Sequence, residues 1–288
     1  MPSTHKTLKD ALDLERLDLN LFRGFTENKE AERIYGGQVI AQSLLAAYQT
    51  VEGRMCHSLH AYFIRPGNPR IPVIFEVDRA RDGASFTTRR VIAVQNGKQI
   101  FNLAASFHIP EECFDHQSTM PAVTPPEELR DDYDVESDLY DMMPEDEKVA
   151  RPQRDPNPTM EMRSVDPPRP GFSSLSREPI QRLWIRATHE LPDDPIWHQV
   201  VLAYASDMSL LGTAMRPHPY TWEQIMNASL DHAIWFHRPF NVNEWMLYDM
   251  DSPSSSGARG FNRGALYTRD GVLAASVTQE GLFRKKKG

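Results

Sequence analysis

The chain has 288 residues, 40% of them hydrophobic and 25% charged, enough for one large folded domain or two of ordinary size. No apolar run reaches the roughly 18 residues that a membrane helix needs. Two cysteines, Cys56 and Cys113, exclude a disulfide framework and a cysteine-rich zinc site. The first residues carry mixed charge without the apolar core of a signal peptide, so we expect a cytoplasmic protein.

The net charge of −8 is unevenly distributed. Residues 127–147 hold eleven acidic side chains against Arg130, a local charge of 1 − 11 = −10, so the rest of the chain carries −8 + 10 = +2. We interpret the acidic run as a solvated, mobile segment. The chain shows no basic patch of the kind that binds nucleic acids, so we expect no nucleic-acid partner.

The first third of the chain predicts helices followed by strands. We expect an amphipathic helix over residues 8–22 and a second helix from Gly36-Gly37 to about residue 50. Runs rich in β-forming residues predict strands at 58–65, 72–81, 85–95 and 99–109, and Asn96-Gly97 predicts a tight hairpin between the last two. This is one helix followed by an antiparallel meander.

Residues 110–170 hold eleven of the 22 prolines together with the acidic run, which predicts an irregular, exposed connection over residues 111–170. Beyond it, residues 184–188 are typical of a strand, and Asp193-Asp194-Pro195 predicts the start of a helix that continues to about Met215. Further strands are expected at 229–238, 244–250, 259–268 and 272–283, with a turn at Asp270-Gly271.

The second half repeats the first. Phe63-Ile64-Arg65-Pro66 returns as Phe236-His237-Arg238-Pro239, at an offset of 238 − 65 = 173. The turn Asn96-Gly97 returns as Asp270-Gly271 at an offset of 174, and Ala104-Ala105-Ser106 returns as Ala274-Ala275-Ser276 at an offset of 170. A helix-then-meander unit has therefore been duplicated, and two such units can pair their sheet edges into one sheet.

Several classes of enzyme are excluded by missing motifs. The sequence has no Gly-x-Ser-x-Gly elbow, no Gly-x-Gly-x-x-Gly fingerprint, no P-loop and no His-Glu-x-x-His helix. Its ten histidines lack metal-ligand spacing. If the protein is an enzyme, we expect it to use water and polar side chains, with no cofactor and no metal.

Three polar residues interrupt apolar patterns. On a helical wheel of about 100° per residue, Asp207 lies in the middle of an apolar stripe formed by Ile196, Val200, Ala203, Leu211 and Ala214. Gln279 shares a strand face with apolar residues, and Ser229 opens the strand after the helix. A buried carboxylate or amide needs partners. Each residue is either structural (a loop-capping Asp, a core Gln, a strand-start Ser) or part of a site.

The duplication favours a site. At the offsets above, Ser229 corresponds to Cys56, Gln279 corresponds to Ile109, and Asp207 corresponds to Ala46 or Leu45. A residue that the fold requires should recur in both copies. The three polar groups occur in one copy only, which predicts one working site per chain, in the second repeat.

The chain also resembles a known family along nearly its whole length. The resemblance rests on motifs in the following order: Leu21-Phe22-Arg23-Gly24, Tyr35-Gly36-Gly37-Gln38, residues 57–67, residues 85–90, Tyr204-Ala205-Ser206-Asp207, residues 230–240, Ser256-Gly257-Ala258-Arg259-Gly260 and Gln279-Glu280-Gly281. These residues resemble the acyl-CoA thioesterase II family of double-hotdog thioesterases. The acidic, proline-rich middle does not contribute to the resemblance.

The resemblance implies an α+β double hotdog, with two long helices wrapped by a shared antiparallel sheet. Residues 1–110 would form the first, scaffold repeat, residues 111–175 the connection, and residues 176–288 the catalytic repeat. The family hydrolyses acyl-CoA to free acid and CoA with a water held by an Asp, a Thr or Ser, and a Gln, roles that fall on Asp207, Ser229 and Gln279. The resemblance also makes a homo-dimer or homo-tetramer the expected assembly.

Secondary candidates surround this trio. His57 matches a histidine of the family, although it is also a plausible strand-start residue. The Gly37 N–H is a candidate donor to an oxyanion, the alternative being tight packing of the helix start. Arg259, Arg263 and Arg284 are candidates for binding the CoA phosphates.

Two other functions remain open at the level of sequence. A hotdog enoyl-CoA hydratase would carry a Gly-Asp-x-Asn-Pro-like motif, which this chain lacks. A non-catalytic acyl-CoA-binding protein would need a pocket but no water-holding trio.

Overall fold

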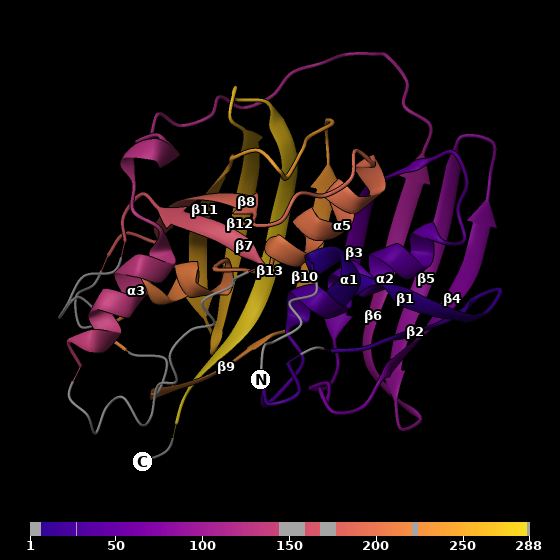
Figure 1. The fold of residues 1–288 in the computed structure, drawn as a ribbon, viewed down its shortest axis with the longest axis horizontal. Coiled ribbons are helices and arrows are strands. Elements are labelled where there is room, and N and C mark those ends of the chain that lie inside the picture. Colours follow the sequence, from indigo (N-terminus) through magenta and orange to yellow (C-terminus); the bar gives the residue numbers. More distant parts are fainter. Residues whose placement is uncertain (1–6, 27, 144–158, 168–176, 221–223, 287–288) are drawn as a thin grey trace.

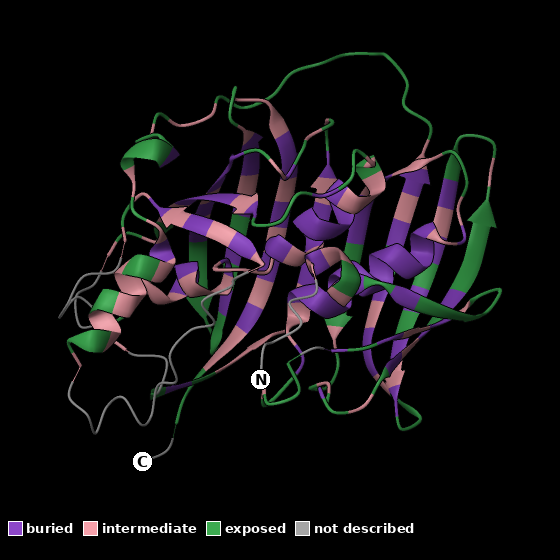
Figure 2. Cartoon of the chain, viewed as in Figure 1, coloured by how far each residue is buried: buried purple, intermediate pink, exposed green. Residues whose placement is uncertain are grey.

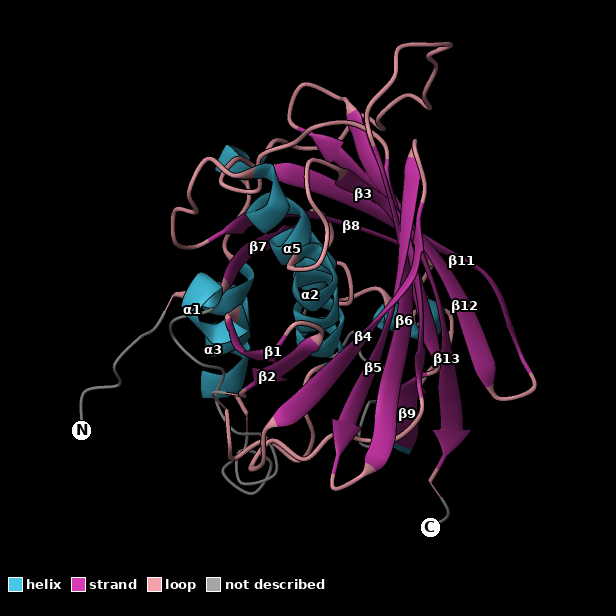
Figure 3. Ribbon diagram, turned by 90° about the vertical axis from the view of Figure 1, so that its right-hand side faces the viewer, coloured by secondary structure: helices cyan, strands magenta, loops and turns pink. Residues whose placement is uncertain are grey.

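The structure is a computed structural model that describes residues 7–26, 28–143, 159–167, 177–220 and 224–286. Within these residues, one large antiparallel sheet runs across the whole molecule, and the helices of both repeats lie on one of its faces (Figures 1 and 3). The order of its strands is β1-β2-β4-β5-β6-β3-β10-β13-β12-β11-β8-β7, with β9 paired to β13.

The first repeat supplies one side of this sheet. Its helices are α1 (Leu8–Leu12) and α2 (Gly36–Tyr48). Its strands are β1 (Leu14–Asp18), β2 (Leu21–Gly24), β3 (Met55–Phe63), β4 (Val73–Asp82), β5 (Phe86–Gln95) and β6 (Lys98–His108). The positive φ angles of Asn96 and Gly97, 49° and 69°, form the predicted tight turn between β5 and β6.

The second repeat supplies the other side. Its main helix is α5 (Pro195–Ala205), followed by the short 3₁₀ helix η3 (Leu211–Met215). Its strands are β8 (Ile180–Ala187), β9 (Ile225–Ser229), β10 (Asp231–Phe236), β11 (Met246–Ser256), β12 (Arg259–Thr268) and β13 (Leu273–Lys285).

The two repeats join edge to edge through β3 and β10. In this antiparallel pair Asp231 lies opposite Tyr62 and Trp235 lies opposite Ser58, with His60 and Ala233 paired between them. His60 and Ala233 are 233 − 60 = 173 residues apart, the offset of the repeated Phe-x-Arg-Pro motif. A pseudo-twofold axis therefore passes between equivalent residues of the two copies, as the duplication predicts.

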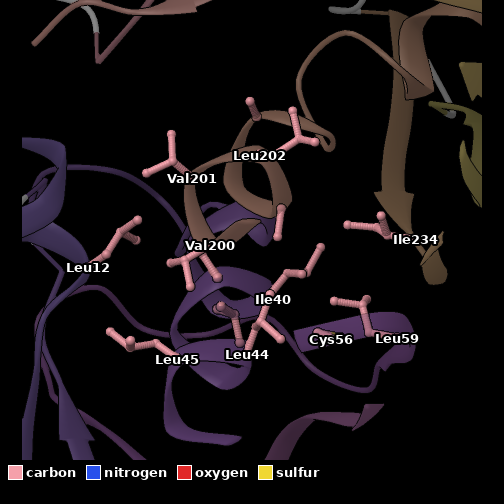
Figure 4. Packing of buried hydrophobic residues seen from close by; sticks show 14 of the residues in the cluster. Leu12, Ile40, Leu44, Leu45, Cys56, Leu59, Val200, Val201, Leu202 and Ile234 are labelled. Atoms are coloured by element: carbon pink, nitrogen blue, oxygen red, sulfur yellow. The ribbon is translucent and has the colours of Figure 1, made fainter. Parts of the chain in front are cut away.

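The core lies between the sheet and helices α2 and α5. Every residue of α2 from Gly37 to Tyr48 is buried, and so are most residues of α5 (Figure 2). Leu44 of α2 and Val200 of α5 lie in the apolar cluster between the two helices, and Leu59 and Ile234 on the joining strands face it (Figure 4). The paired helices and continuous sheet form the predicted double hotdog.

Two helix predictions were too long. The expected helix over residues 8–22 begins with a capping box between Thr7 and Asp10 but ends already at Leu12. The residues that follow form the edge hairpin of β1 and β2, which pairs with β4. The expected helix from residue 195 to Met215 ends at Ala205. Asp207 therefore lies in the turn after the helix, and the helical wheel that singled it out placed it on the wrong element.

The connection after β6 is more ordered than its composition predicts. It contains η1 (Pro126–Glu128), α3 (Asp132–Asp141) and β7 (Met160–Ser164), which adds a strand to the sheet beside β8. The Asp132 carboxylate accepts hydrogen bonds from the N–H and hydroxyl of Ser164, at 2.8 and 2.7 Å. The part of the acidic run from residue 127 to 143 is thus folded, and the rest lies outside the described residues.

The described start of the connection covers the outer face of the second repeat. Met120, Val123 and Leu129 pack on a cluster of Trp184, Trp245, Leu247 and Tyr267, and the Trp184 indole donates a hydrogen bond to the Thr124 carbonyl at 2.9 Å. Among the described residues, no helix is long and apolar enough to cross a membrane.

Candidate active site

The candidate site lies where the end of α5 meets the start of α2. Asp207 follows α5 by two residues, and its side chain points at the N-terminus of the first repeat's helix. The Gly37 N–H donates a hydrogen bond to Asp207 Oδ2 at 3.0 Å. The N-terminus of a helix carries partial positive charge and unpaired N–H groups, so it favours a carboxylate. The site therefore combines a carboxylate from one repeat with a helix start from the other.

Gln279 and Ser229 complete the predicted trio. Gln279 is fully buried on β13, and its amide Nε2 donates to Asp207 Oδ1 at 2.5 Å and to Ser229 Oγ at 3.1 Å. Ser229 ends β9, which pairs with β13 through Ser229 and Gly281. The structure brings the three residues together although they are up to 279 − 207 = 72 residues apart in sequence.

Two glycines let the backbones approach this closely. A Cβ atom on Gly36 would lie 2.7 Å from Asp207 Oδ2, and one on Gly37 would lie 2.3 Å from the Tyr204 carbonyl oxygen. Both distances are below any ordinary contact, so a larger residue at either position would push α2 away from the turn that carries Asp207. Tight packing, the structural alternative for the Gly36-Gly37 pair, is thus present in the structure.

The surroundings of Asp207 raise the pKa of its carboxyl group. Desolvation by burial is the largest cause, and hydrogen bonds from Gln279, Gly37 and Ser229, with the charge of Arg33, act in the opposite direction. Burial dominates although the side chain keeps partial contact with solvent. Arg33 itself is exposed and donates to the backbone and side-chain oxygens of Asn227 on β9.

The sheet register confirms one of the predicted correspondences between the repeats and corrects another. Ser229 pairs with Gly281 as Cys56 pairs with Phe107, so Ser229 does correspond to Cys56. In the pair of β10 and β13, Ala233 faces Thr278, so the next position places Gln279 opposite His232. In the equivalent pair of the first repeat, β3 and β6, Ala105 lies opposite Leu59. Gln279 therefore corresponds to Ala105, at an offset of 279 − 105 = 174, and not to Ile109.

The helix ends correct the correspondence of Asp207. Thr50 follows α2, and its hydroxyl donates to the Ala47 carbonyl at 2.8 Å. Ser206 follows α5 and donates in the same way to the Ala203 carbonyl at 2.9 Å. Asp207 then corresponds to Val51, and not to Ala46 or Leu45. The three counterparts are Val51, Cys56 and Ala105, so the polar groups still occur in one copy only.

The structure does not bring His57 to this site. His57 Nε2 lies 2.8 Å from Ser106 Oγ on β6. Ser106 alternates with the buried residues Ala105 and Phe107, so it faces the outside of the sheet. His57 packs there against Phe86 and His108, on the opposite face from the helices. His57 therefore lies apart from the trio, and its role as a secondary catalytic residue stays a prediction from the sequence.

The three predicted CoA-binding arginines also face away from the trio. Residues that pair across strands share a face, and Gln279 pairs with Asn262 on the helix side. Arg263 pairs with Thr278 and Arg259 with Leu282, so both lie on the outer face, as does Arg284 by alternation along β13. Arg259 is also ion-paired with Glu280 at 2.9 Å, and Arg263 with Asp251. None of the three lies beside Asp207.

The helix-start prediction is modified as well. The Gly37 N–H, predicted as the donor to an oxyanion, is hydrogen-bonded to Asp207, so in this structure it orients that carboxylate. In the part of the chain that the structure describes, no group of three or more His, Cys, Asp or Glu residues is arranged to hold a metal ion.

Comparisons with known proteins show the family to which the chain belongs. Residues 171–282 match the family described as acyl-CoA thioesterase, and residues 27–108 match the acyl-CoA thioesterase N-terminal domain. The chain is similar to acyl-coenzyme A thioesterase 8 of Homo sapiens, with 42% identity over 96% of this chain and 88% of the relative. It is 37% identical to acyl-CoA thioesterase 2 of Haemophilus influenzae, over 95% of each chain.

A solved structure is similar over the same length. The acyl-CoA thioesterase II TesB2 of Mycobacterium marinum has a TM-score of 0.78 and 39% identity, covering 97% of this chain and 99% of the other. The family models, the relatives and the solved structure thus point to the same family. The chain belongs to the acyl-CoA thioesterase family of thioester hydrolases.

Proposed function

We propose that the protein hydrolyses fatty acyl-CoA to a free fatty acid and CoA at one site per chain, formed by Asp207, Ser229 and Gln279. The observation that carries the proposal is the Asp207 carboxylate held between the Gly37 N–H and the Gln279 amide, beside a serine hydroxyl. Each carboxylate oxygen accepts one of these hydrogen bonds and keeps a second lone pair for another donor. A water molecule is the donor that hydrolysis requires.

Asp207 acts as the general base in this proposal. Burial raises the pKa of its carboxyl group, which makes the ionised form a stronger base than an exposed aspartate. The carboxylate takes a proton from water while the water oxygen attacks the thioester carbonyl carbon. The C–S bond then breaks, and the CoA thiolate leaves with the proton that Asp207 took, directly or through solvent.

Ser229 and Gln279 orient the base and the water. Gln279 donates to both of the other residues, so its two amide protons fix the relative positions of Asp207 Oδ1 and Ser229 Oγ. The Ser229 oxygen accepts from Gln279, which leaves its own proton for the carboxylate or the water. Holding the water near the carbonyl carbon lowers the barrier because the reactants need no further ordering.

The start of α2 supplies positive charge for the developing oxyanion. Because Gly37 is engaged by Asp207, we assign the oxyanion to the preceding N–H, that of Gly36. It is the first residue of the helix, so its N–H has no acceptor within the helix. The positive end of the α2 dipole acts in the same direction.

An assay with three readouts separates this function from its alternatives. The protein is incubated with saturated and 2-enoyl-CoA substrates of several chain lengths, and free thiol, enoyl absorbance and substrate binding are followed. We expect thiol release from the saturated acyl-CoAs. Loss of enoyl absorbance without thiol release would identify a hydratase, and binding without either reaction would identify an acyl-CoA-binding protein. The homo-dimer or homo-tetramer and the cytoplasmic location remain predictions from the sequence.

A further inference from the structure

The turn that carries Asp207 is held by hydrogen bonds from outside the helix. The last carbonyl groups of any helix lack intrahelical donors. Here the Tyr204 carbonyl accepts from the Tyr35 hydroxyl at 3.0 Å, and the Ala205 carbonyl accepts from the Met208 N–H at 2.9 Å. The Ser206 carbonyl accepts from the Tyr248 hydroxyl at 2.7 Å. Side chains from distant elements therefore set the path of the chain into Asp207.

Ser206 is held from a second side by His232. The Ser206 hydroxyl donates to the Ala203 carbonyl, so it has no proton left for the imidazole, whose Nε2 lies 2.9 Å away. Nε2 must then carry the proton and donate to Ser206 Oγ. Burial lowers the pKa of His232 to about 3, so the ring is neutral, and its Nδ1 has no hydrogen-bond partner in the described structure.

Both groups are absent from the first repeat. Tyr248, Leu266, Ala275 and Phe236 lie side by side across four strands, as Phe75, Ala93, Phe101 and Phe63 do in the other copy. Tyr248 thus corresponds to Phe75, at an offset of 248 − 75 = 173. By the same offset His232 corresponds to Leu59, which lies in the apolar cluster between the helices (Figure 4).

The comparison shows which parts of these two side chains serve the packing that both repeats share. Phe75 and Leu59 are both fully buried, as is the Tyr248 ring. A ring at one position and an apolar side chain at the other therefore satisfy the packing. The hydroxyl of Tyr248 and the imidazole of His232 occur only in the repeat that carries Asp207. In the first repeat the charged Arg89 donates to the corresponding two atoms of Thr50 instead, so a neutral clamp is specific to the repeat with the carboxylate.

We propose that Tyr248 and His232 are positioning residues that clamp Ser206 and thereby aim the Asp207 carboxylate. The proposal rests on the function proposed above. The Ser206 carbonyl and the Asp207 N–H belong to one rigid peptide plane. A hydroxyl that fixes the direction of this carbonyl also fixes the direction in which the chain enters Asp207, and so where its side chain points. The hydrogen bond from His232 to Ser206 Oγ restrains the side chain of Ser206 as well.

The chain itself supplies the test variants, Tyr248→Phe and His232→Leu, because these are the residues of the first repeat. In Tyr248→Phe we expect kcat to fall about tenfold, with KM for acyl-CoA unchanged, because a small misplacement of a catalytic group is costly. His232→Leu should lower kcat by a smaller factor. It should fold well, because it removes a buried nitrogen without a partner.

The pH profile gives a readout that a purely structural role would not change. Hydrogen bonds from Gln279 and Gly37 lower the pKa of Asp207, in opposition to desolvation. A carboxylate that drifts from these donors has a higher pKa, so it becomes ionised only at higher pH. The acidic limb of kcat/KM should therefore move to higher pH in Tyr248→Phe.

A matched control is Tyr267→Phe. Tyr267 is a buried tyrosine of β12 whose hydroxyl contacts Ser118 Oγ at 2.8 Å, away from the Asp207 turn. The Tyr267→Phe variant loses one tyrosine hydrogen bond, as Tyr248→Phe does, so its free energy of unfolding should fall by a similar amount. Its kcat and pH profile should stay those of the wild type.

The Asp207→Asn background decides whether the clamp acts through Asp207. There, adding Tyr248→Phe or His232→Leu should leave the residual rate unchanged. The clamp would be overturned if the folded single variants kept the wild-type kcat and the wild-type acidic limb. It would also be overturned if each substitution lowered the rate by the same factor in the wild-type and in the Asp207→Asn background. If Asp207→Asn alone kept the wild-type rate, the proposed catalytic site would fail instead, which is a different result.

Discussion

The ends of the two central helices are built from the same parts and completed in different ways. After α2, the Arg89 guanidinium donates to Thr50 Oγ1 at 2.8 Å and to the Thr50 carbonyl at 3.0 Å. After α5, the corresponding residue Ser206 is held at the same two atoms by His232 and Tyr248. One buried arginine does in the first repeat what two neutral side chains do in the second.

This difference supports the proposal that only the second helix end carries a base. Arg89 pairs with Ala105 on β6, and Asn262 pairs with Gln279 on β13, so Arg89 and Asn262 occupy equivalent strand positions. A carboxylate beside the buried Arg89 would be held as an ion pair, with a lowered pKa and little basicity. Asn262 and the neutral clamp remove that cation. The second repeat can therefore keep Asp207 desolvated and basic.

The largest effect among the supporting residues is expected at the helix start. In Gly36→Ala the new Cβ atom would lie 2.7 Å from Asp207 Oδ2 and must displace the carboxylate. We expect kcat to fall about a hundredfold, the scale of a misplacement of about 1 Å. Alanine favours helices more than glycine does. A thermal melt should therefore show no loss of helix, and unchanged kcat would mean that the close approach of α2 is irrelevant to catalysis.

Removing the amide should have the next largest effect. Gln279→Ala deletes both hydrogen bonds that link Asp207 to Ser229, so we expect kcat to fall about tenfold or more. Ser229→Ala should be milder, because Gln279 still holds the carboxylate. Ser229→Thr keeps the hydroxyl and serves as the control, with turnover near wild type. Steady-state CoA release by the four proteins would rank them, and a larger loss for Ser229→Ala than for Gln279→Ala would contradict this order.

A substitution at the end of α2, in the first repeat, should lower stability without changing turnover. Arg89→Met removes the donors to Thr50 and to the Arg81 and Thr88 carbonyls, and buried acceptors without donors are costly. We expect the free energy of unfolding to fall by about 3 kcal/mol. Urea denaturation would measure it, alongside kcat at a temperature where the variant is folded. A large fall in kcat would show that the two ends are functionally coupled.

The smallest effect on turnover is expected for a substitution that gives the first repeat a hydroxyl at the position equivalent to Ser229. Cys56→Ser places at Cys56 the side chain that Ser229 has in the second repeat. We expect unchanged turnover, because Val51 and Ala105 supply neither a base nor an amide there. Any gain in rate would show that the first repeat is less inert than its residues indicate. Activity per folded protein, determined by CoA release, is the measurement.

Much of this arrangement could be predicted from the sequence because the duplication leaves local signals. The turn residues Asn96-Gly97 and the alternation in the strands fix the two meanders, and the polar residues Ser229 and Gln279 interrupt apolar faces. Asp207 was singled out for a reason that the structure corrects, since the apolar pattern runs on past the end of the helix. The chain stops being helical there because distant tyrosine hydroxyls and a local serine bind the last carbonyls.

Other features depend on contacts that no short-range pattern encodes. The sidedness of Arg259 and Arg263 follows from the register of β12 against β13, which a single sequence leaves undefined. Tyr248 and His232 are ordinary strand residues until they are aligned with Phe75 and Leu59. Offsets taken from the short Ala-Ala-Ser repeat misplaced the counterpart of Gln279 by four residues, 109 − 105 = 4. The two motifs are not equivalent positions, because Ala275 faces Phe236 as Phe101 faces Phe63. The turn offset of 174 would have found it.

The central claim is that the carboxylate after α5 activates the attacking water, and Asp207→Asn tests it most directly. The amide keeps the size of the side chain and cannot take a proton. We predict a fall in kcat of about a hundredfold or more, with acyl-CoA binding retained and circular dichroism unchanged, because the lost interaction belongs to the transition state. A folded Asp207→Asn protein that releases CoA at the wild-type rate would show that the carboxylate is structural and that the chemistry lies elsewhere.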